Sequence, residues 1–523
     1  MSSNDNLIET NGVRIAIEGC GHGTLDAIYA SVERSCRERK WPDVDLLIIC
    51  GDFQSVRNAA DLTTMSCPAK YREIGDFHKY YSGARKAPYL TLFVAGNHEA
   101  SSYLSELYYG GWVAPNIYYM GAANVVRFGP LRIAGLSGIW QQGDYHKPRS
   151  ERLPFGPKDI KTFYHVRELD VRKLLQIRTQ VDIGLSHDWP NGIERHGDYV
   201  QLYKNKPHFK KESERGELGN PAAGYVLDRL RPRYWFSAHM HCKFSAIKEH
   251  PPPGQEDKPQ AALAPAVNHD EIDLDMSDSD VPAAGLKKEP EKDTQVDIEA
   301  LRAKLPPSFA KPIKPGQPVP DTITNRTTRF LSLDKCLPGR HFLQLMEILP
   351  ADGSKVQRPL RLQYDPEWLS ILRVFHASSK PSSTPPDPDQ GEAHYLPLIA
   401  ESMAWVTENI ISKDKLDIPL NFTPTAPAYD PKNPETTKEG MPKEYNNPQM
   451  AAFCELLGLE NWWYEKEEER EERWKRDWAS LPDWWVDELS GKGQKSGAGG
   501  FRGGRGGGRG GGRGGRGRGG TGR

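Results

Sequence analysis

The sequence lacks paired cysteines, long apolar runs and a leader-like N-terminus. Its seven cysteines are odd in number and none stands in a Cys-x-x-Cys pair, so we expect no disulfide framework and favour a reducing compartment. The N-terminal stretch MSSNDNLIET has no basic region followed by an apolar run, which argues against a signal peptide. No apolar stretch reaches the roughly 18 residues of a membrane-spanning helix. We therefore expect a soluble intracellular protein without membrane contacts.

A strong net charge is also missing, although the charges are unevenly distributed. The formal net charge is −1 over 523 residues, but residues 270–280 carry six acidic side chains, and the stretch from Phe501 carries seven arginines and no acid. The near-neutral total therefore says little about partners, and the local patches say more. The length predicts about two or three domains.

The first half of the chain has the pattern of a layered α/β domain. Residues 1–248 alternate apolar runs with helical patterns, which is typical of strands and helices packed in layers. One helix is expected over residues 24–39, because the apolar residues of one face recur there at helical spacing; they are Leu25, Ile28, Tyr29 and Val32.

The remainder of the chain divides by composition. Residues 249–325 are rich in proline and acid, which predicts a disordered linker. Apolar content returns over residues 326–490, where we expect a smaller, largely helical domain with a helix over 395–411. Within it, residues 461–489 mix charges with tryptophans, which is typical of a solvated helix that docks through its tryptophans. Residues 491–523 are rich in glycine and arginine and are expected to be a disordered tail.

Five short polar clusters in the first half each follow an apolar run that has the pattern of a strand. They are Cys20-Gly21-His22, Gly51-Asp52, Gly96-Asn97-His98-Glu99, His187-Asp188 and His239-Met240-His241. In an open α/β sheet the carboxyl ends of neighbouring strands converge on one crevice, so the clusters can meet in space. Imidazole, carboxylate and amide oxygen are ligand types of a divalent metal. The pattern therefore predicts a metal-assisted enzyme.

These motifs resemble the calcineurin-like metallophosphoesterase superfamily, whose pattern is DxH, GDxx, GNHE, a lone His and HxH. Within the superfamily, GCGHG, GDFQSVRN, GNHE, SGIW, YHVRE, LSHDWPNG and SAHMH are similar to the RNA lariat debranching enzymes. The resemblance covers roughly residues 13–245, and TTRFLSLDKCLPGR looks like the start of that family's C-terminal domain. It implies a layered metallophosphoesterase fold of β-sheets flanked by helices, with a smaller C-terminal domain and the tail.

The resemblance also implies two metal sites that share one carboxylate. The implied ligands are His22, Asp52 and His241 at one site, and Asp52, Asn97, His187 and His239 at the other. A carboxylate suits the shared position because it has two oxygens and a negative charge. Two cations about 3.5–4 Å apart can share a hydroxide, lower its pKa and neutralise the charge of a phosphodiester.

Three neighbouring residues receive supporting or catalytic roles. His98 resembles the catalytic histidine of the superfamily, which would stabilise charge on phosphorus or protonate the leaving oxygen. Glu99 is expected to orient His98 or a ligand, and Asp188 is expected to be a structural carboxylate.

Cys20 stands where most metallophosphoesterases have an aspartate, and a cysteine there is typical of the debranching enzymes. A thiol weakens the first site for hard Mg²⁺ and favours softer ions. We expect Fe²⁺, Zn²⁺ or Mn²⁺. Whether Cys20 binds the metal or only lines the pocket is left open by the sequence.

The implied reaction is hydrolysis of the 2′–5′ phosphodiester at the branchpoint of excised intron lariat RNA, in mRNA processing and intron degradation. Metal-activated hydroxide would attack phosphorus, and the branchpoint 2′-oxygen would leave. Two other functions stay open: a protein phosphatase or cyclic-nucleotide phosphodiesterase, and a non-catalytic RNA-binding scaffold. Cys20 and the basic segments count against the first, and the retained Asp52, Asn97, His98 and His187 count against the second.

Residues 139–178 lie where the debranching family carries its lariat-recognition insertion. This stretch holds nine Lys/Arg against five acids, interleaved with aromatic residues on which unpaired bases can stack. The residues expected to contact RNA are Trp140, Tyr145, Tyr164 and Arg167. The alternative is an ordinary basic surface loop with a helix.

The tail over residues 491–523 is an RGG segment, in which arginines pair with phosphates and stack on bases. We expect it to bind single-stranded RNA, the alternative being a solubilising tail. Nuclear residence, with cytoplasmic shuttling open, follows from the implied substrate. The C-terminal region is a candidate contact for splicing or RNA-turnover proteins.

Overall fold

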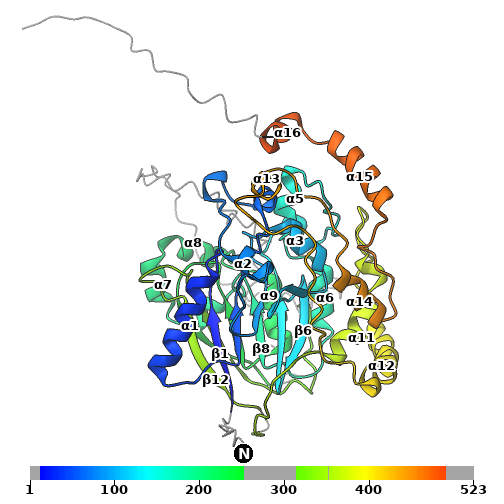
Figure 1. The fold of residues 1–523 in the computed structure, drawn as a ribbon. Helices are drawn as coiled ribbons and strands as arrows, with labels where there is room; N and C mark the ends of the chain where they lie inside the picture. The colour runs from blue at the N-terminus through cyan, green and yellow to red at the C-terminus, as the bar shows by residue number, and fades with distance from the viewer. Residues whose placement is uncertain (1–11, 253–313, 352, 491–523) are drawn as a thin grey trace, which may run out of the picture.

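The computed structural model describes residues 12–252, 314–351 and 353–490 (Figure 1). The predicted RGG tail and most of the predicted linker lie outside these ranges. Residues 314–325 were predicted as linker, but they pack on the catalytic half of the chain. Val319 and Ile323 are buried, and Arg229 donates hydrogen bonds to the carbonyls of Gly316 and Pro318. Composition missed this because an extended, proline-rich segment can be held by partners elsewhere in the chain.

Two mixed sheets form the centre of the molecule. The first has the order β12 (Leu343–Ile348), β1 (Val13–Glu18), β2 (Leu46–Ile49), β3 (Thr91–Phe93), β5 (Ile117–Tyr119) and β4 (Gly111–Ala114). The second has the order β10 (Phe244–Glu249), β11 (Thr327–Ser332), β9 (Tyr234–Ser237), β8 (Ile183–Ser186), β7 (Leu131–Leu136), β6 (Ala123–Phe128) and β13 (Leu362–Tyr364).

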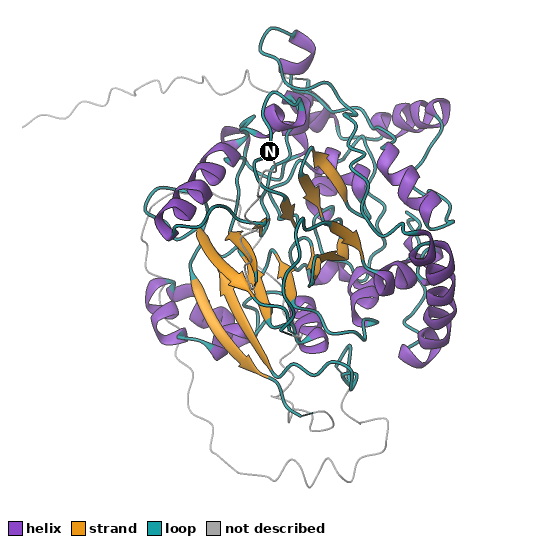
Figure 2. Cartoon of the chain, turned by 60° about the horizontal axis from the view of Figure 1, so that its bottom comes forward, coloured by secondary structure: helices purple, strands orange, loops and turns teal. Residues whose placement is uncertain are grey.

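Helices cover the outer faces of both sheets, as Figure 2 shows. In the described ranges the α-helices are α1 (Leu25–Arg39), α2 (Phe77–Tyr81), α3 (Ser101–Leu104), α4 (Gln142–Tyr145), α5 (Pro157–Thr162), α6 (Glu168–Leu175), α7 (Tyr199–Asn205), α8 (Pro207–Arg215), α9 (Pro221–Leu230), α11 (Pro366–Val374), α12 (Glu392–Asn409), α13 (Pro434–Thr437), α14 (Pro448–Leu456), α15 (Glu467–Ala479) and α16 (Asp483–Leu489). The predicted layered α/β fold is thus confirmed.

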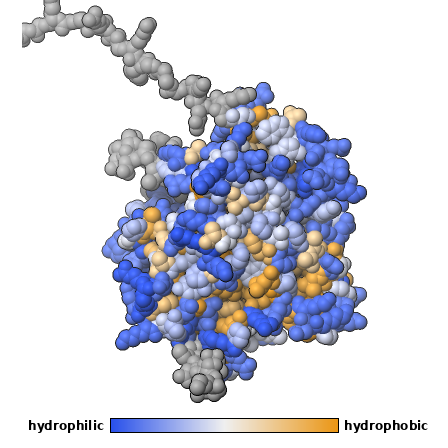
Figure 3. All heavy atoms as spheres, in the orientation of Figure 1, coloured by the Kyte–Doolittle hydropathy of each residue, from blue (hydrophilic) through white to orange (hydrophobic). Residues whose placement is uncertain are grey.

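The apolar core follows from the alternation of side chains along the strands. Ile15 and Ile17 of β1 face Ile133 and Ile183 of the second sheet in one cluster, while Ala16 points outward to α1. The predicted helix at 24–39 is α1, and its predicted apolar face is buried. No helix in the described part of the chain has the length and apolar character to cross a membrane, and hydrophilic residues predominate on the face in Figure 3.

The C-terminal segment contributes strands to both sheets before it becomes helical. β12 pairs antiparallel with β1, β11 lies between β9 and β10, and β13 pairs antiparallel with β6. The helical pattern expected over 395–411 corresponds to α12. The boundary predicted at residue 326 therefore does not separate two independent sheets, since the strands of the C-terminal segment complete those of the first half.

The tryptophan-rich segment docks as expected, through two helices. α15 and α16 meet at Ser480–Pro482, and the buried Trp485 packs with Leu153 and Phe155. Its indole Nε1 donates a hydrogen bond of 3.0 Å to the carbonyl of Phe155. The C-terminal end of the described chain is thereby anchored on the segment predicted to be the insertion.

A buried ion pair ties α11 to the second sheet, and its removal should destabilise the protein. Arg132 on β7 donates to both oxygens of Asp365, at 2.8 and 2.7 Å, and Asp365 caps α11 by accepting from Trp368 N–H. Because D365A leaves a buried guanidinium without its main partner, we expect it to lower the free energy of unfolding by about 3–5 kcal/mol. Urea denaturation followed by circular dichroism measures this loss.

The matched control is E38A, which breaks an exposed ion pair with Arg34 on α1. Exposed pairs contribute little, so this change should cost less than about 1 kcal/mol. Equal losses for the two variants would contradict the structural role of the buried pair.

Candidate metal centre

The five predicted ligand clusters come together at the carboxyl ends of the strands. Cys20 and His22 follow β1, Asp52 follows β2, and Asn97 and His98 follow β3. From the second sheet, His187 follows β8, while His239 and His241 follow β9. Strands β1, β2 and β3 are parallel, as are β8 and β9, so each sheet delivers its ligands at one edge.

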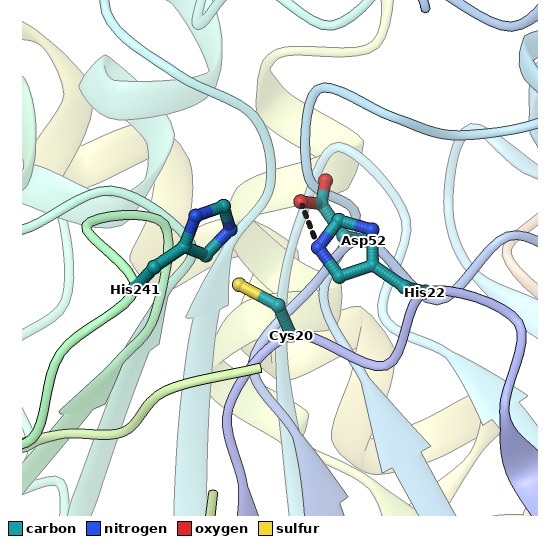
Figure 4. A group of neighbouring side chains, drawn as sticks. All are labelled: Cys20, His22, Asp52 and His241. Carbon is teal, nitrogen blue, oxygen red and sulfur yellow. Dashed lines mark ion pairs between the residues drawn. The ribbon is translucent and has the colours of Figure 1, made fainter. Parts of the chain in front are cut away.

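The first group of side chains is compact enough to hold one ion. One potential ligand atom from each of Cys20, His22, Asp52 and His241 lies within 4.8 Å of the others. Their side chains point toward one another in Figure 4. His22 Nε2 is 3.5 Å from Asp52 Oδ2, and the rings of His22 and His241 are 5.6 Å apart.

A second group of side chains lies beside the other carboxylate oxygen of Asp52. Its Oδ1 is 3.4 Å from His187 Nε2, which is also 3.3 Å from Asn97 Oδ1. The ring of His239 lies 5.0 Å from that of His187. Asp52 therefore faces one group with each carboxylate oxygen, which is the arrangement that a bridging ligand requires.

The protonation states suit cation binding. Burial lowers the pKa of His22 to about 4 and that of His241 to about 3, so both imidazoles are neutral and keep a lone pair. Burial opposes ionisation of Asp52, but His187, His98 and His22 together hold its pKa well below the usual range. Burial raises the pKa of the Cys20 thiol.

Individual hydrogen bonds also direct free nitrogens to the centre. His187 Nδ1 donates to the Cys50 carbonyl at 2.7 Å, which leaves Nε2 to face Asp52. His22 Nε2 is buried and has no hydrogen-bond partner. A buried ring nitrogen without a partner is costly, and a cation bound through its lone pair would satisfy it. The donor set thus fits a divalent metal.

Backbone strain is concentrated on these residues. Left-handed φ angles are found at His22 (42°), Asp52 (48°), His239 (58°) and His241 (47°). Residues with a side chain adopt this region at a cost and keep it where surrounding structure enforces it. The strain therefore marks the ligand loops as a functional site.

Two glycines let the loops approach one another. A Cβ on Gly51 would lie 2.2 Å from His187 Nδ1, and one on Gly96 would lie 2.2 Å from Asp52 Oδ1. Any larger residue at either position would displace a predicted ligand. The glycines of GDFQ and GNHE are required by this close packing.

His98 lies at the edge of the centre, where it is 8% exposed. Its backbone N–H donates to Asp52 Oδ1 at 2.9 Å, and its Nδ1 donates to the Ser66 carbonyl at 3.1 Å. Nε2 lies 3.2 Å from Asn97 Nδ2. The Asn97 amide therefore stands between His187 and His98.

Glu99 and Asp188 hold loops together. Glu99 accepts hydrogen bonds from the backbone N–H groups of Phe53, Gln54 and Gly96, at 2.8–2.9 Å. Burial and the Asp52 charge raise its pKa to about 7. Glu99 thus positions the loop that carries Asp52, and no bond between it and the His98 ring is found in the described structure. Asp188 accepts from Trp189 N–H at 2.8 Å.

The four residues expected to contact RNA are largely buried. Their exposed fractions are 9% for Trp140, 7% for Tyr145, 5% for Tyr164 and 2% for Arg167. Arg167 pairs with Glu151 at 2.5 Å. Direct contact with RNA would require these side chains to become exposed, and their assignment stays a prediction.

Tyr164 has a contact that the sequence did not reveal. Its hydroxyl lies 3.0 Å from Ser66 Oγ, and the Ser66 carbonyl accepts from His98. This residue of the segment predicted as the insertion therefore helps to fix the loop that orients His98.

Sequence analysis also missed Lys335, which lies beside the centre. Lys335 forms a parallel backbone bridge with Cys20, flanked by hydrogen bonds from Cys20 N–H to Asp334 and from Cys336 N–H to Cys20. Burial is the main cause of the low pKa values of His22 and His241, and the positive charge of Lys335 contributes a smaller lowering. The signal in the sequence is the motif LSLDKCLPGR, whose resemblance predicts only the start of the C-terminal domain.

Comparison with known proteins agrees with this geometry. Residues 13–243 match the family model of calcineurin-like phosphoesterases, and residues 325–462 match that of the lariat debranching enzyme C-terminal domain. The chain is 42% identical to the lariat debranching enzyme of Schizosaccharomyces pombe, covering 86% of this chain and 96% of that protein.

Two further relatives are similar over most of this chain. The lariat debranching enzyme of Homo sapiens is 40% identical over 86% of this chain and 69% of its own length, and that of Arabidopsis thaliana is 38% identical over 86% of both. The chain belongs to the lariat debranching enzyme family, within the calcineurin-like phosphoesterases, and is a metal-dependent phosphodiesterase.

Proposed function

We propose that this chain hydrolyses the 2′–5′ phosphodiester at the branchpoint of excised intron lariat RNA, which linearises the intron for degradation. The observation that carries the proposal is the cluster of Cys20, His22, Asp52 and His241 in a chain that belongs to the lariat debranching enzymes. In the reaction, water adds across the bond between phosphorus and the 2′-oxygen. The phosphate stays on the 5′ end of the intron, and the branchpoint nucleotide gains a 2′-hydroxyl.

The residues around the centre would form two ion sites that share Asp52. We propose that Cys20, His22, Asp52 and His241 hold one ion, and that Asp52 with His187, His239 and Asn97 holds a second. Divalent ions at such a centre lower the pKa of water and neutralise phosphodiester charge during in-line displacement.

His98 would transfer a proton to the leaving oxygen. Because Nδ1 donates to the Ser66 carbonyl, Nε2 is the nitrogen left to hold or release a proton at the substrate. Asn97 and Ser66 keep the ring in place for that role.

Replacing His98 tests the chemistry. We expect H98A to lower kcat on a branched RNA by about 10²–10⁴-fold, because the proton would lose its positioned carrier. Metal content, measured by elemental analysis, should stay unchanged, since His98 is not a predicted ligand. The wild type should leave a linear 3′–5′ RNA uncut.

The matched control is H394A, an exposed histidine on α12. It should retain the wild-type rate. Cleavage of linear RNA at the branched rate, or of neither substrate, would refute the proposed function.

The Cys20 thiol should determine the choice of metal. We propose Fe²⁺, Zn²⁺ or Mn²⁺ as the native ion, because a sulfur donor favours softer cations than Mg²⁺. C20D would restore a hard oxygen donor. We expect it to raise activity with Mg²⁺ relative to Zn²⁺ by about tenfold or more, measured by metal titration of the metal-free protein.

C50A serves as the matched control, because Cys50 is a second buried thiol nearby that is outside the ligand cluster. Its metal preference should equal that of the wild type. An unchanged preference in C20D would mean that Cys20 only lines the pocket.

We propose in addition that the RGG tail binds single-stranded RNA. Deletion of residues 491–523 should weaken RNA binding at low salt, because seven arginines from Phe501 onward are lost, while turnover of a minimal branch stays intact. Filter binding across a salt series measures the first effect. A loss of turnover on the minimal branch would instead make the tail part of the active site.

We also propose nuclear residence, because intron lariats form in the nucleus, and contacts of the C-terminal region with splicing or RNA-turnover proteins. Imaging and affinity purification of a tagged full-length chain test both. A strictly cytoplasmic chain that recovers no such protein would contradict them.

A further inference from the structure

A second basic surface lies outside the segment that was predicted to recognise RNA. Residues 195–211 carry five Lys/Arg and one acid, and they span α7 and α8. These helices lie on the left of Figure 1, whereas α5 and α6 lie toward the right. The two basic segments thus flank the strands that carry the ligands.

The topology brings this surface to the metal centre. β10, which begins three residues after His241, forms the edge of the second sheet, and Gly197 forms a bridge with Ala246 on it. Lys206 Nζ lies 5.9 Å from the centre of the Phe209 ring, and the Phe209 ring lies 6.4 Å from that of Trp189. Trp189 Nε1 in turn donates a hydrogen bond of 3.0 Å to the carbonyl of Ala238, the residue before His239. Lys206 is therefore connected to the ligand loop through two packed aromatic side chains.

Five lysines extend from the centre to these helices, and we call them the lysine strip. They are Lys335, Lys243, Lys206, Lys204 and Lys211. Among the residues that the structure describes, no carboxylate lies within the 4.0 Å ion-pair distance of any of their ammonium groups. Three of them, Lys204, Lys211 and Lys243, are exposed, and Lys206 and Lys335 are half-buried.

The predicted insertion differs in this respect. Its arginines already pair with carboxylates. The pairs within the segment are Arg149–Asp170, Arg167–Glu151 and Arg172–Glu168, and those with the C-terminal segment are Arg152–Glu465 and Arg178–Glu392. An ion-paired guanidinium offers little charge to a phosphate. The lysine strip, in contrast, keeps its cationic charge available to a phosphate.

Exposed apolar groups accompany these lysines on α7. Tyr199 is 45% exposed and Val200 is 55% exposed, and the Tyr199 ring lies 5.7 Å from that of Tyr203. Aromatic faces next to unpaired lysines are the combination that binds single-stranded nucleic acid, since bases stack while phosphates pair with the cations.

We propose that one single-stranded arm of the branched RNA leaves the metal centre over Lys335 and Lys243 and runs along α7 and α8. This inference rests on the proposed function. A cation beside a metal centre raises the local positive potential, and the polyanion compensates it. The lysine strip thus supplies affinity and direction to an arm, while the ligand cluster performs the hydrolysis.

The test compares two substrates and two sets of exposed or half-buried lysines. The variant K204Q/K206Q/K211Q removes three charges from α7, α8 and the residue that joins them. The matched control, K86Q/K413Q/K415Q, removes three exposed charges elsewhere, one of them before the amino end of β3. The substrates are a minimal branch with one nucleotide per arm and a branch with arms of about ten nucleotides, a length that one binding module spans.

We expect the strip variant to raise KM for the long-armed branch about tenfold and to leave its kcat unchanged. The slope of log(kcat/KM) against log salt should become shallower by about 2, since each lost phosphate contact on a single strand contributes about 0.7. Kinetics on the minimal branch should equal those of the wild type. Melting temperatures confirm that both variants are folded, and K243Q, which leaves the helices intact, should raise KM in the same direction.

Several outcomes would overturn the inference. An unchanged KM and salt slope on the long-armed branch would make the lysines a solvated face or a contact for another partner. An equal loss on the minimal branch would place them in the chemical step, and an equal loss in the control would show a general charge effect. Failure of the wild type to cleave the minimal branch would instead refute the proposed function, so the two failures are distinguishable.

Discussion

The ionised carboxylate of Asp52 is the charge on which the rest of the centre depends. Taking a carboxylate out of water costs several kcal/mol unless neighbours compensate it, and this side chain is 1% exposed. The backbone N–H of His98 donates to it, and the side chains of His22 and His187 flank its two oxygens. These partners follow strands of both sheets. The contacts of one carboxylate therefore hold the two sheet edges in position relative to each other.

The ligand loops are strained, and the double sheet supplies the rigidity that keeps them so. Left-handed φ angles are found at His22, Asp52, His239 and His241. A loop without packing partners would relax to a conformation of lower energy. Strands β2, β3 and β8 beneath them are buried throughout, and Glu99 accepts hydrogen bonds from three backbone amides of two loops. This scaffold leaves the imidazoles neutral and their nitrogens directed inward before any ion arrives.

Several features that look local in the sequence turn out to be shared between distant segments. The motif LSLDKCLPGR has the pattern of the start of a separate domain, yet β11 enters the second sheet and Lys335 lies beside Cys20. The segment at 139–178 was predicted from its basic and aromatic residues as an RNA surface, but Tyr164 and Arg167 are buried against protein partners. Charge counts along a sequence do not reveal which cations are already neutralised.

The sequence by itself determined the ligand chemistry, the helix α1 and the family, because strand-end motifs and helical periodicity are local patterns of a few neighbouring residues. Only the tertiary structure decided that β12 and β13 complete sheets begun far upstream and that Asp52 faces histidines from two sheets. It also decided that no carboxylate of the described residues pairs with the lysine strip beside the metal centre. Those outcomes depend on contacts between distant segments, whose pairing free energies no local pattern encodes.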